Sequence, residues 1–267
     1  MDVDFATLYE QAVSSIEEVC SQLSDEDWDL PTDLPGWSVK DNLSHLVHFE
    51  ATAIGQASPD DLDVSHRAHA TDAFQIANEK GVEHRRGRSG KEVLDEFVGV
   101  TRERLRSIHS LTEEQWDDPI MLPVGEVPQG RIMPIRLSDF YFHEQDIRRA
   151  TGRPGHLRGG IARLVFERFG FTGMPRVIGK EVAPPDGTVV AFDVGEPGES
   201  FAVRVSDGRG EVVPRPADPA VTIACDFETF LCLVGGRWTR ERAGDRARVE
   251  GDPALAARIF DEIAMTP

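Results

Sequence analysis

"PGWSVKDNLSHLVHFE", residues 35–50, predicts a turn followed by a helix that carries a histidine on its inner side. Ser38 is a candidate N-cap, and Asp41 three residues later completes a short capping box. The apolar residues recur at helical spacing: Val39, Leu43, Leu46, Val47 and Phe49. His45 lies among them. It is therefore either a hydrogen-bonded core residue or one ligand of a metal site whose other ligands lie elsewhere.

A second candidate segment is "DFYFHEQD", residues 139–146. Asp139 and His143 are four positions apart, so on a helix they share one face, with Cβ atoms roughly 6 Å apart. A carboxylate and an imidazole at this spacing can hold one divalent ion, as the two histidines of HExxH do. His45 could supply a third ligand and leave coordination positions open. The pair is also typical of an exposed ion pair on a helix, and local spacing does not join the three residues.

Apolar periodicity predicts a bundle of about four long helices over residues 1–155, with 117–134 irregular and the last helix beginning at 135. Residues 156–184 are expected to form a helical connection. From 185 to 267 the sequence alternates and then returns to helical spacing, which is typical of a smaller α+β unit. "DG" at 207–208 predicts a tight turn between two of the strands. The expected fold class is therefore α+β and multidomain.

Composition excludes several functional classes for this 267-residue chain. The formal charge of −18 disfavours nucleic acid and anionic lipid as partners. There is no apolar run of the ~20 residues that cross a membrane, and the N-terminus lacks a signal-peptide pattern, so we expect a cytoplasmic protein. A helical bundle with an α+β domain can stand alone, so we expect a monomer or a weak dimer. The cysteines are too few and too scattered for a disulfide framework: Cys20, Cys225 and Cys232.

The two signature segments resemble the mycothiol-dependent maleylpyruvate isomerase family, which belongs to the DinB-like metalloprotein superfamily. The first motif is matched by Pro35, Gly36, Trp37, Ser38, Val39, Lys40, Asp41, Leu43, His45, Leu46 and Glu50. The second is matched by His143, Asp146, Ile147, Arg149, Ala150 and Gly152. The sequence departs from the pattern at Asp139, where the family has glutamate.

The resemblance implies a DinB-like four-helix bundle followed by a sterol-carrier-like domain. It implies a divalent metal, most commonly zinc, held by His45, Asp139 and His143, although Asp139 is one methylene shorter than the usual ligand. It also implies mycothiol as a thiol cosubstrate. Because a metal-bound thiol loses its proton, the thiolate would be the nucleophile of a transferase or isomerase that acts on a small electrophile. Arg237 would bind an anionic substrate group, or else it is a surface arginine at a helix end.

Other interpretations stay open at this stage. The chain could be a non-catalytic protein, either a carrier of a small apolar ligand or a regulatory module, with a structural or lost metal site. His48 is a weaker ligand candidate and otherwise a pocket wall. Asp146 either accepts a hydrogen bond from an imidazole N–H or pairs with a neighbouring arginine. Trp37 is expected to pack at the helix entry.

Overall fold

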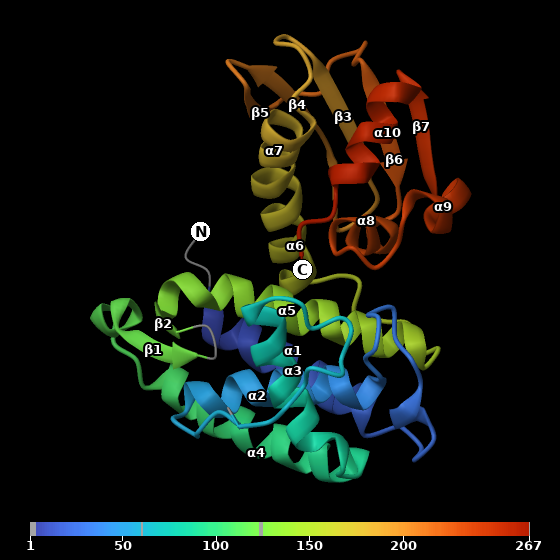
Figure 1. The fold of residues 1–267 in the computed structure, drawn as a ribbon. Coiled ribbons are helices and arrows are strands. Elements are labelled where there is room, and N and C mark those ends of the chain that lie inside the picture. The colour runs from blue at the N-terminus through green and yellow to red at the C-terminus, as the bar shows by residue number, and fades with distance from the viewer. Residues whose placement is uncertain (1–3, 60, 123–124, 267) are drawn as a thin grey trace. The chain divides into compact units, whose positions relative to one another are not determined.

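The computed structural model describes residues 4–59, 61–122 and 125–266. The chain divides into two compact units, which meet at the bond between Gly155 and His156. The first unit is helical and the second contains a five-stranded sheet (Figure 1). The expected α+β multidomain fold class is confirmed. None of the described helices is long and apolar enough to cross a membrane.

The first unit is a bundle built around one central helix, α2 (Figure 1). Its helices are α1 (Phe5–Cys20), α2 (Val39–Ala53), α3 (Ala73–Arg86), α4 (Gly90–His109) and α5 (Gln129–Ala150). Two short 3-10 turns, Asp27–Asp29 and Glu114–Asp117, lie in the connections. Helix α2 packs against α3, α4 and α5, and α1 packs against α4 and α5.

The start of α2 forms as the sequence predicts. Ser38 is its N-cap, and the side chains of Ser38 and Asp41 make the reciprocal bonds of a capping box. Because α2 is surrounded by three other helices, its polar residues are buried together with its apolar ones, among them Asn42, His45 and Glu50. Buried polar groups need partners. Asn42 and His45 contact residues of α5, and Glu50 binds residues of both α5 and α1.

The segment 117–134 is more ordered than the sequence predicts. It forms a β-hairpin of β1 (Pro119–Leu122) and β2 (Gly125–Pro128), and α5 begins directly afterwards at Gln129 and continues through Pro134. Leu122 and Ile132 are buried against Phe49 of α2. Burial of these apolar side chains stabilises the hairpin and the first turns of α5, whereas Pro134 by itself favours a later helix start.

The second unit begins with a continuous helical run made of α6 (Gly160–Phe166), η3 (Glu167–Gly173), α7 (Met174–Arg176) and η4 (Val177–Val182). The sheet order is β5-β4-β3-β6-β7. Its strands are β3 (Val189–Val194), β4 (Ser200–Ser206), β5 (Arg209–Val213), β6 (Val221–Cys225) and β7 (Ala247–Gly251). The pair β3–β6 is parallel and the other pairs are antiparallel.

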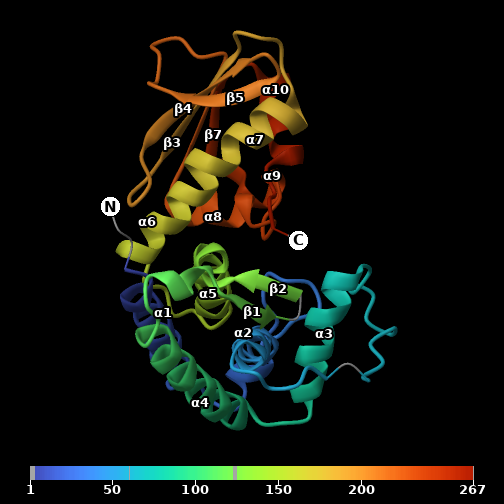
Figure 2. The same ribbon diagram turned by 90° about the vertical axis from the view of Figure 1, so that its left-hand side faces the viewer.

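Helices cover this sheet from within the same unit. The helical run packs against β4 and β5 (Figure 2), and α10 (Pro253–Glu262) packs against β6 and β7 (Figure 1). The remaining helices are α8 (Phe227–Val234), α9 (Arg240–Ala243) and the short turn Gly244–Arg246. The turn predicted at 207–208 joins β4 to β5, and both Asp207 (φ 51°) and Gly208 (φ 66°) have the positive φ that a type I′ turn requires.

Candidate metal centre

Three predicted residues meet where α2 faces α5. His45, Asp139 and His143 each place one donor atom within 4.8 Å of the others. The Nε2 atom of His45 lies 3.3 Å from Oδ2 of Asp139, and the Nε2 atom of His143 lies 3.3 Å from Oδ1 of the same carboxylate. Both imidazoles therefore present the same ring nitrogen to one carboxylate. Residues 94 positions apart in the sequence (His45 and Asp139) are brought together only by the helix packing.

The cluster is buried on its histidine side and open on its carboxylate side. The side chains of His45 and His143 are 5% and 6% exposed, whereas that of Asp139 is 27% exposed. The Trp37 ring packs on both imidazoles, with centroid distances of 5.1 Å to His45 and 5.8 Å to His143. Phe49 packs edge-on against His45 at 5.1 Å. A small ligand could therefore reach the cluster from the Asp139 side, while aromatic rings hold the imidazoles in place.

A metal ligand must be a neutral imidazole or an ionised carboxylate, and burial and charge favour these states at His45 and Asp139. Burial lowers the pKa of His45 to about 4, although the Asp139 carboxylate opposes the shift. Burial alone would raise the pKa of Asp139, but Arg136 and the two histidines outweigh it and hold that pKa well below its usual range. At neutral pH the cluster thus contains a neutral imidazole at His45 and an ionised carboxylate. Nitrogen and oxygen donors of this kind suit zinc and similar divalent ions.

Asn42 determines which nitrogen of His143 carries the proton. Its amide nitrogen donates to the carbonyl of Ser38 at 2.9 Å and to the hydroxyl of Thr32 at 3.1 Å. Its Oδ1 atom must therefore accept the 2.7 Å hydrogen bond from Nδ1 of His143. This bond leaves the lone pair of that imidazole on Nε2, which faces Asp139. His45 has no such acceptor, because its Nδ1 is buried without a hydrogen-bond partner among the described residues.

We expect Asn42→Ala to weaken divalent-metal binding by roughly 10- to 100-fold, because the His143 ring would lose the partner that sets its tautomer and orientation. Competition with a chromophoric chelator measures the affinity. Asn78→Ala is the matched control, since Asn78 is a buried asparagine on α3 that is not one of the three clustered residues. Equal affinities of Asn42→Ala and the wild type would contradict this role.

The two neighbouring candidates, His48 and Asp146, are not part of the donor set. His48 packs on α3, where a Cβ added to Gly81 would lie 2.2 Å from its ring. Asp146 forms an ion pair with Arg149, and its other oxygen lies 3.8 Å from Nδ1 of His143. The sequence offered Asp146 either as the acceptor of an imidazole N–H or as the partner of an arginine. The closer acceptor is Asn42, which lies inside the quoted segment 35–50.

Arg237 lies in the second unit, just after α8. It is 7% exposed, and its Nη1 atom donates to the carbonyl of Gly235 at 2.7 Å and to the hydroxyl of Thr266 at 3.0 Å. It is therefore a buried arginine held by its own domain, not a surface arginine at a helix end. Its role towards a substrate stays a prediction.

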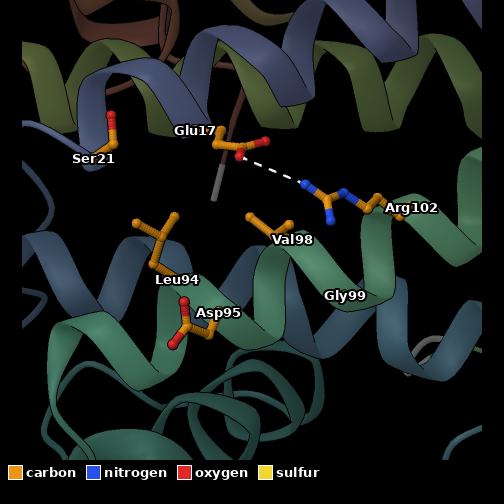
Figure 3. A pocket seen from close by; sticks show the side chains of 7 residues that line it. All are labelled: Glu17, Ser21, Leu94, Asp95, Val98, Gly99 and Arg102. Carbon is orange, nitrogen blue, oxygen red and sulfur yellow. Dashed lines mark ion pairs between the residues drawn. The ribbon is translucent and has the colours of Figure 1, made fainter.

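A surface groove of about 450 Å³ lies elsewhere in the first unit, between α1 and α4 (Figure 3). Its lining residues are Glu17, Ser21, Leu94, Asp95, Val98, Gly99 and Arg102. Glu17 and Arg102 face each other across it at 4.0 Å. The lining contains no histidine or cysteine and none of the three clustered residues, so the candidate metal centre is the better site for chemistry.

Comparisons with known proteins agree with this architecture. Residues 9–148 match the family model of the mycothiol maleylpyruvate isomerase N-terminal domain, and residues 177–261 match that of the SCP-2 sterol transfer family. The fold is similar to the crystal structure of a mycothiol-dependent maleylpyruvate isomerase, with a TM-score of 0.55, 13% identity and 92% of each chain covered. The crystal structure of a histidine-to-alanine mutant of a mycothiol-dependent maleylpyruvate isomerase gives a TM-score of 0.56 and 12% identity, again with 92% of each chain covered. No relative among curated protein sequences matches this chain.

Proposed function

This chain belongs to the family of the mycothiol maleylpyruvate isomerase N-terminal domain, and from that membership we propose that it is a metal-dependent enzyme. In this proposal it uses mycothiol as the thiol of a transferase or isomerase reaction on a small electrophile. The observation that carries the proposal is the donor set in the core of the bundle, two imidazole Nε2 atoms that face one carboxylate. The carboxylate side is also the exposed side, where a thiol and a substrate could enter.

His45, Asp139 and His143 would hold the metal, with zinc as the first choice for a nitrogen and oxygen donor set. When bound, the cation would supply one chemical effect, stabilisation of the thiolate form of mycothiol. Trp37 and Phe49 keep the two imidazoles oriented and exclude water from their buried side. The partly exposed Asp139 leaves room beside it for the thiol and the electrophile.

The chain's own cysteines are poor nucleophiles, which favours a thiol from outside. Burial raises the pKa of Cys20 far above its usual range and raises that of Cys225 to about 12. Cys232 is buried in α8. A thiol with a raised pKa is protonated at neutral pH and reacts slowly. None of the three belongs to the candidate metal centre.

The proposed function is tested with zinc-loaded protein, mycothiol and a panel of electrophiles. The first member of the panel is maleylpyruvate, which appears in the name of the structurally similar isomerase. We expect turnover that requires both the metal and the thiol. A transferase consumes one thiol per product, whereas an isomerase leaves the thiol concentration unchanged, so thiol titration separates the two reaction types. Metal-loaded protein that converts no member of the panel in a mycothiol-dependent way would contradict the proposal.

Arg237 is proposed to bind an anionic group of the substrate. We expect Arg237→Gln to raise KM for an anionic substrate by roughly 10- to 100-fold, because hydrogen bonds to a charged group contribute about 1.5–3 kcal/mol. Metal content should not change. Arg242→Gln is the control, since Arg242 is an exposed arginine on α9. An unchanged KM in the Arg237 variant would exclude this role.

An apolar-ligand carrier is the second candidate, and the sterol-transfer match over residues 177–261 favours it. Phenyl rings, however, fill much of the interior of this domain. The Phe166 ring lies within 6.4 Å of four others, and the Phe192 ring stacks on Phe201 at 5.0 Å. We therefore rank the carrier role second. Native mass spectrometry of the purified protein distinguishes the two, because a bound lipid without metal would favour the carrier.

A further inference from the structure

A buried ion pair lies directly behind the candidate metal centre. Arg136 stands one turn before Asp139 on α5, and its Nη1 atom contacts Oδ2 of that carboxylate. The Nε and Nη2 atoms of the same guanidinium donate to Oε1 of Glu50 at 3.1 and 3.0 Å. Arg136 is 5% exposed and Glu50 is 2% exposed. One arginine therefore joins a carboxylate of the metal centre to a second carboxylate in the core.

Glu50 is itself held from the far side. The hydroxyl of Tyr9 donates to its Oε2 atom at 2.7 Å, and Nε of Arg104 lies 3.9 Å from the same oxygen. The Arg136 guanidinium also lies over the Phe49 ring, with 4.4 Å to the centroid. These contacts come from α1, α2, α4 and α5, so the whole bundle determines where the guanidinium sits.

We propose that Glu50, held by Tyr9, is a positioning residue that controls metal binding at Asp139 through Arg136. This inference rests on the proposed function, because it concerns the same metal centre. Glu50 fixes the direction of the guanidinium, and the guanidinium in turn fixes Oδ2 of Asp139. Oδ2 of Asp139 contacts Arg136 and also lies 3.3 Å from Nε2 of His45, whereas Oδ1 faces Nε2 of His143.

Charge gives Glu50 a second effect. A divalent cation bound between the two histidines would lie beside a buried, positively charged guanidinium, and like charges repel strongly where water is excluded. The Glu50 carboxylate offsets the charge of Arg136 at a distance of 3.0 Å. Without that carboxylate, Arg136 would compete with the cation for Asp139 and would also repel it.

The shortened ligand adds to the importance of this contact. Asp139 is a short ligand, because an aspartate has one rotatable bond fewer than a glutamate with which to adjust. Its position therefore depends more on the groups that hold it. Arg136 is the strongest of these, because a guanidinium binds a carboxylate in a fixed geometry.

The test measures zinc affinity by chelator competition and the visible spectrum of the cobalt-substituted protein, which reports the ligand geometry. We expect Glu50→Gln to weaken zinc binding by roughly 100-fold and Tyr9→Phe by roughly 10-fold, within the range known for partners of metal ligands. Both variants should alter the cobalt spectrum. If Glu50→Gln does not fold, Tyr9→Phe carries the test, because it removes one hydroxyl and leaves every charge in place.

Glu96→Gln is the matched control. Glu96 binds the buried Arg85 through two hydrogen bonds of 3.0 and 2.7 Å, so its replacement also breaks a partly buried arginine–carboxylate pair, but neither residue belongs to the metal centre. Its zinc affinity and cobalt spectrum should match the wild type even if its stability falls. Wild-type affinity in both Glu50→Gln and Tyr9→Phe would overturn this inference and leave the proposed function standing. A wild-type protein that binds no metal would overturn both.

Discussion

Replacing His143 with alanine is expected to remove the bound divalent ion and to reduce mycothiol-dependent turnover by about 10³-fold or more. His143 is the better oriented of the two imidazoles, since Asn42 directs its Nε2 lone pair towards Asp139. Its loss would leave one imidazole and one carboxylate, too few ligands for a stable catalytic site. Metal-ion catalysis contributes several kcal/mol of transition-state stabilisation, and each 1.36 kcal/mol corresponds to a factor of ten in rate.

Elemental analysis of tag-free protein, wild type and variant side by side, measures the metal content. His45→Ala should behave like His143→Ala, whereas His48→Ala should keep its metal, because His48 packs on Gly81 of α3. His84→Ala is the surface control, as His84 is exposed near the end of α3. If the His143→Ala protein kept the metal content and turnover of the wild type, the three clustered residues would not be the metal ligands.

The second large effect concerns the stability of the second unit, where α7 and η4 pass close to β5. A Cβ on Gly179 would lie 2.2 Å from the backbone nitrogen of Gly210, and a Cβ on Gly210 would lie 2.1 Å from the carbonyl oxygen of Pro175. Neither obstacle is a flexible side chain, so the helix and the strand would have to move apart. We expect Gly179→Ala and Gly210→Ala each to lower the free energy of unfolding by about 3 kcal/mol or more.

Urea unfolding followed by circular dichroism measures this loss. Gly99→Ala provides the contrast, because Gly99 lies on α4 and a Cβ added there would have no neighbour within 4 Å. There the added methyl group should stabilise the protein by about 0.5–1 kcal/mol, since alanine is the better helix former. If all three variants unfold at the same urea concentration, the close approach of η4 and β5 is not a constraint on the fold.

The local sequence predicts several features correctly because they depend on neighbours in the chain. The Ser38–Asp41 capping box and the turn at 207–208 depend on residues within a few positions of one another. The pairing of Asp139 with His143 follows from helix geometry alone. The motif resemblance then singled out His45 as the third member of the cluster, and helix packing brings it there.

The partners of these residues depend on which helices touch, and local spacing contains no such information. His45 and His48 both lie on α2 among apolar residues, yet one faces α5 and the other faces α3, because α2 is surrounded on several sides. The pairing of β1 with β2 is stabilised because Leu122 and Ile132 pack on an apolar surface at Phe49.

By itself, the sequence determined the fold class, the cap that begins α2 and the Asp139–His143 pair, since periodicity, caps and helical spacing are local properties, and the motif resemblance added His45 as the third candidate ligand. Only the tertiary structure decided that Asn42 orients His143 and that Tyr9, Glu50 and Arg136 support Asp139. The reason is physical. A buried polar group must find its partner wherever the packing of distant segments places one.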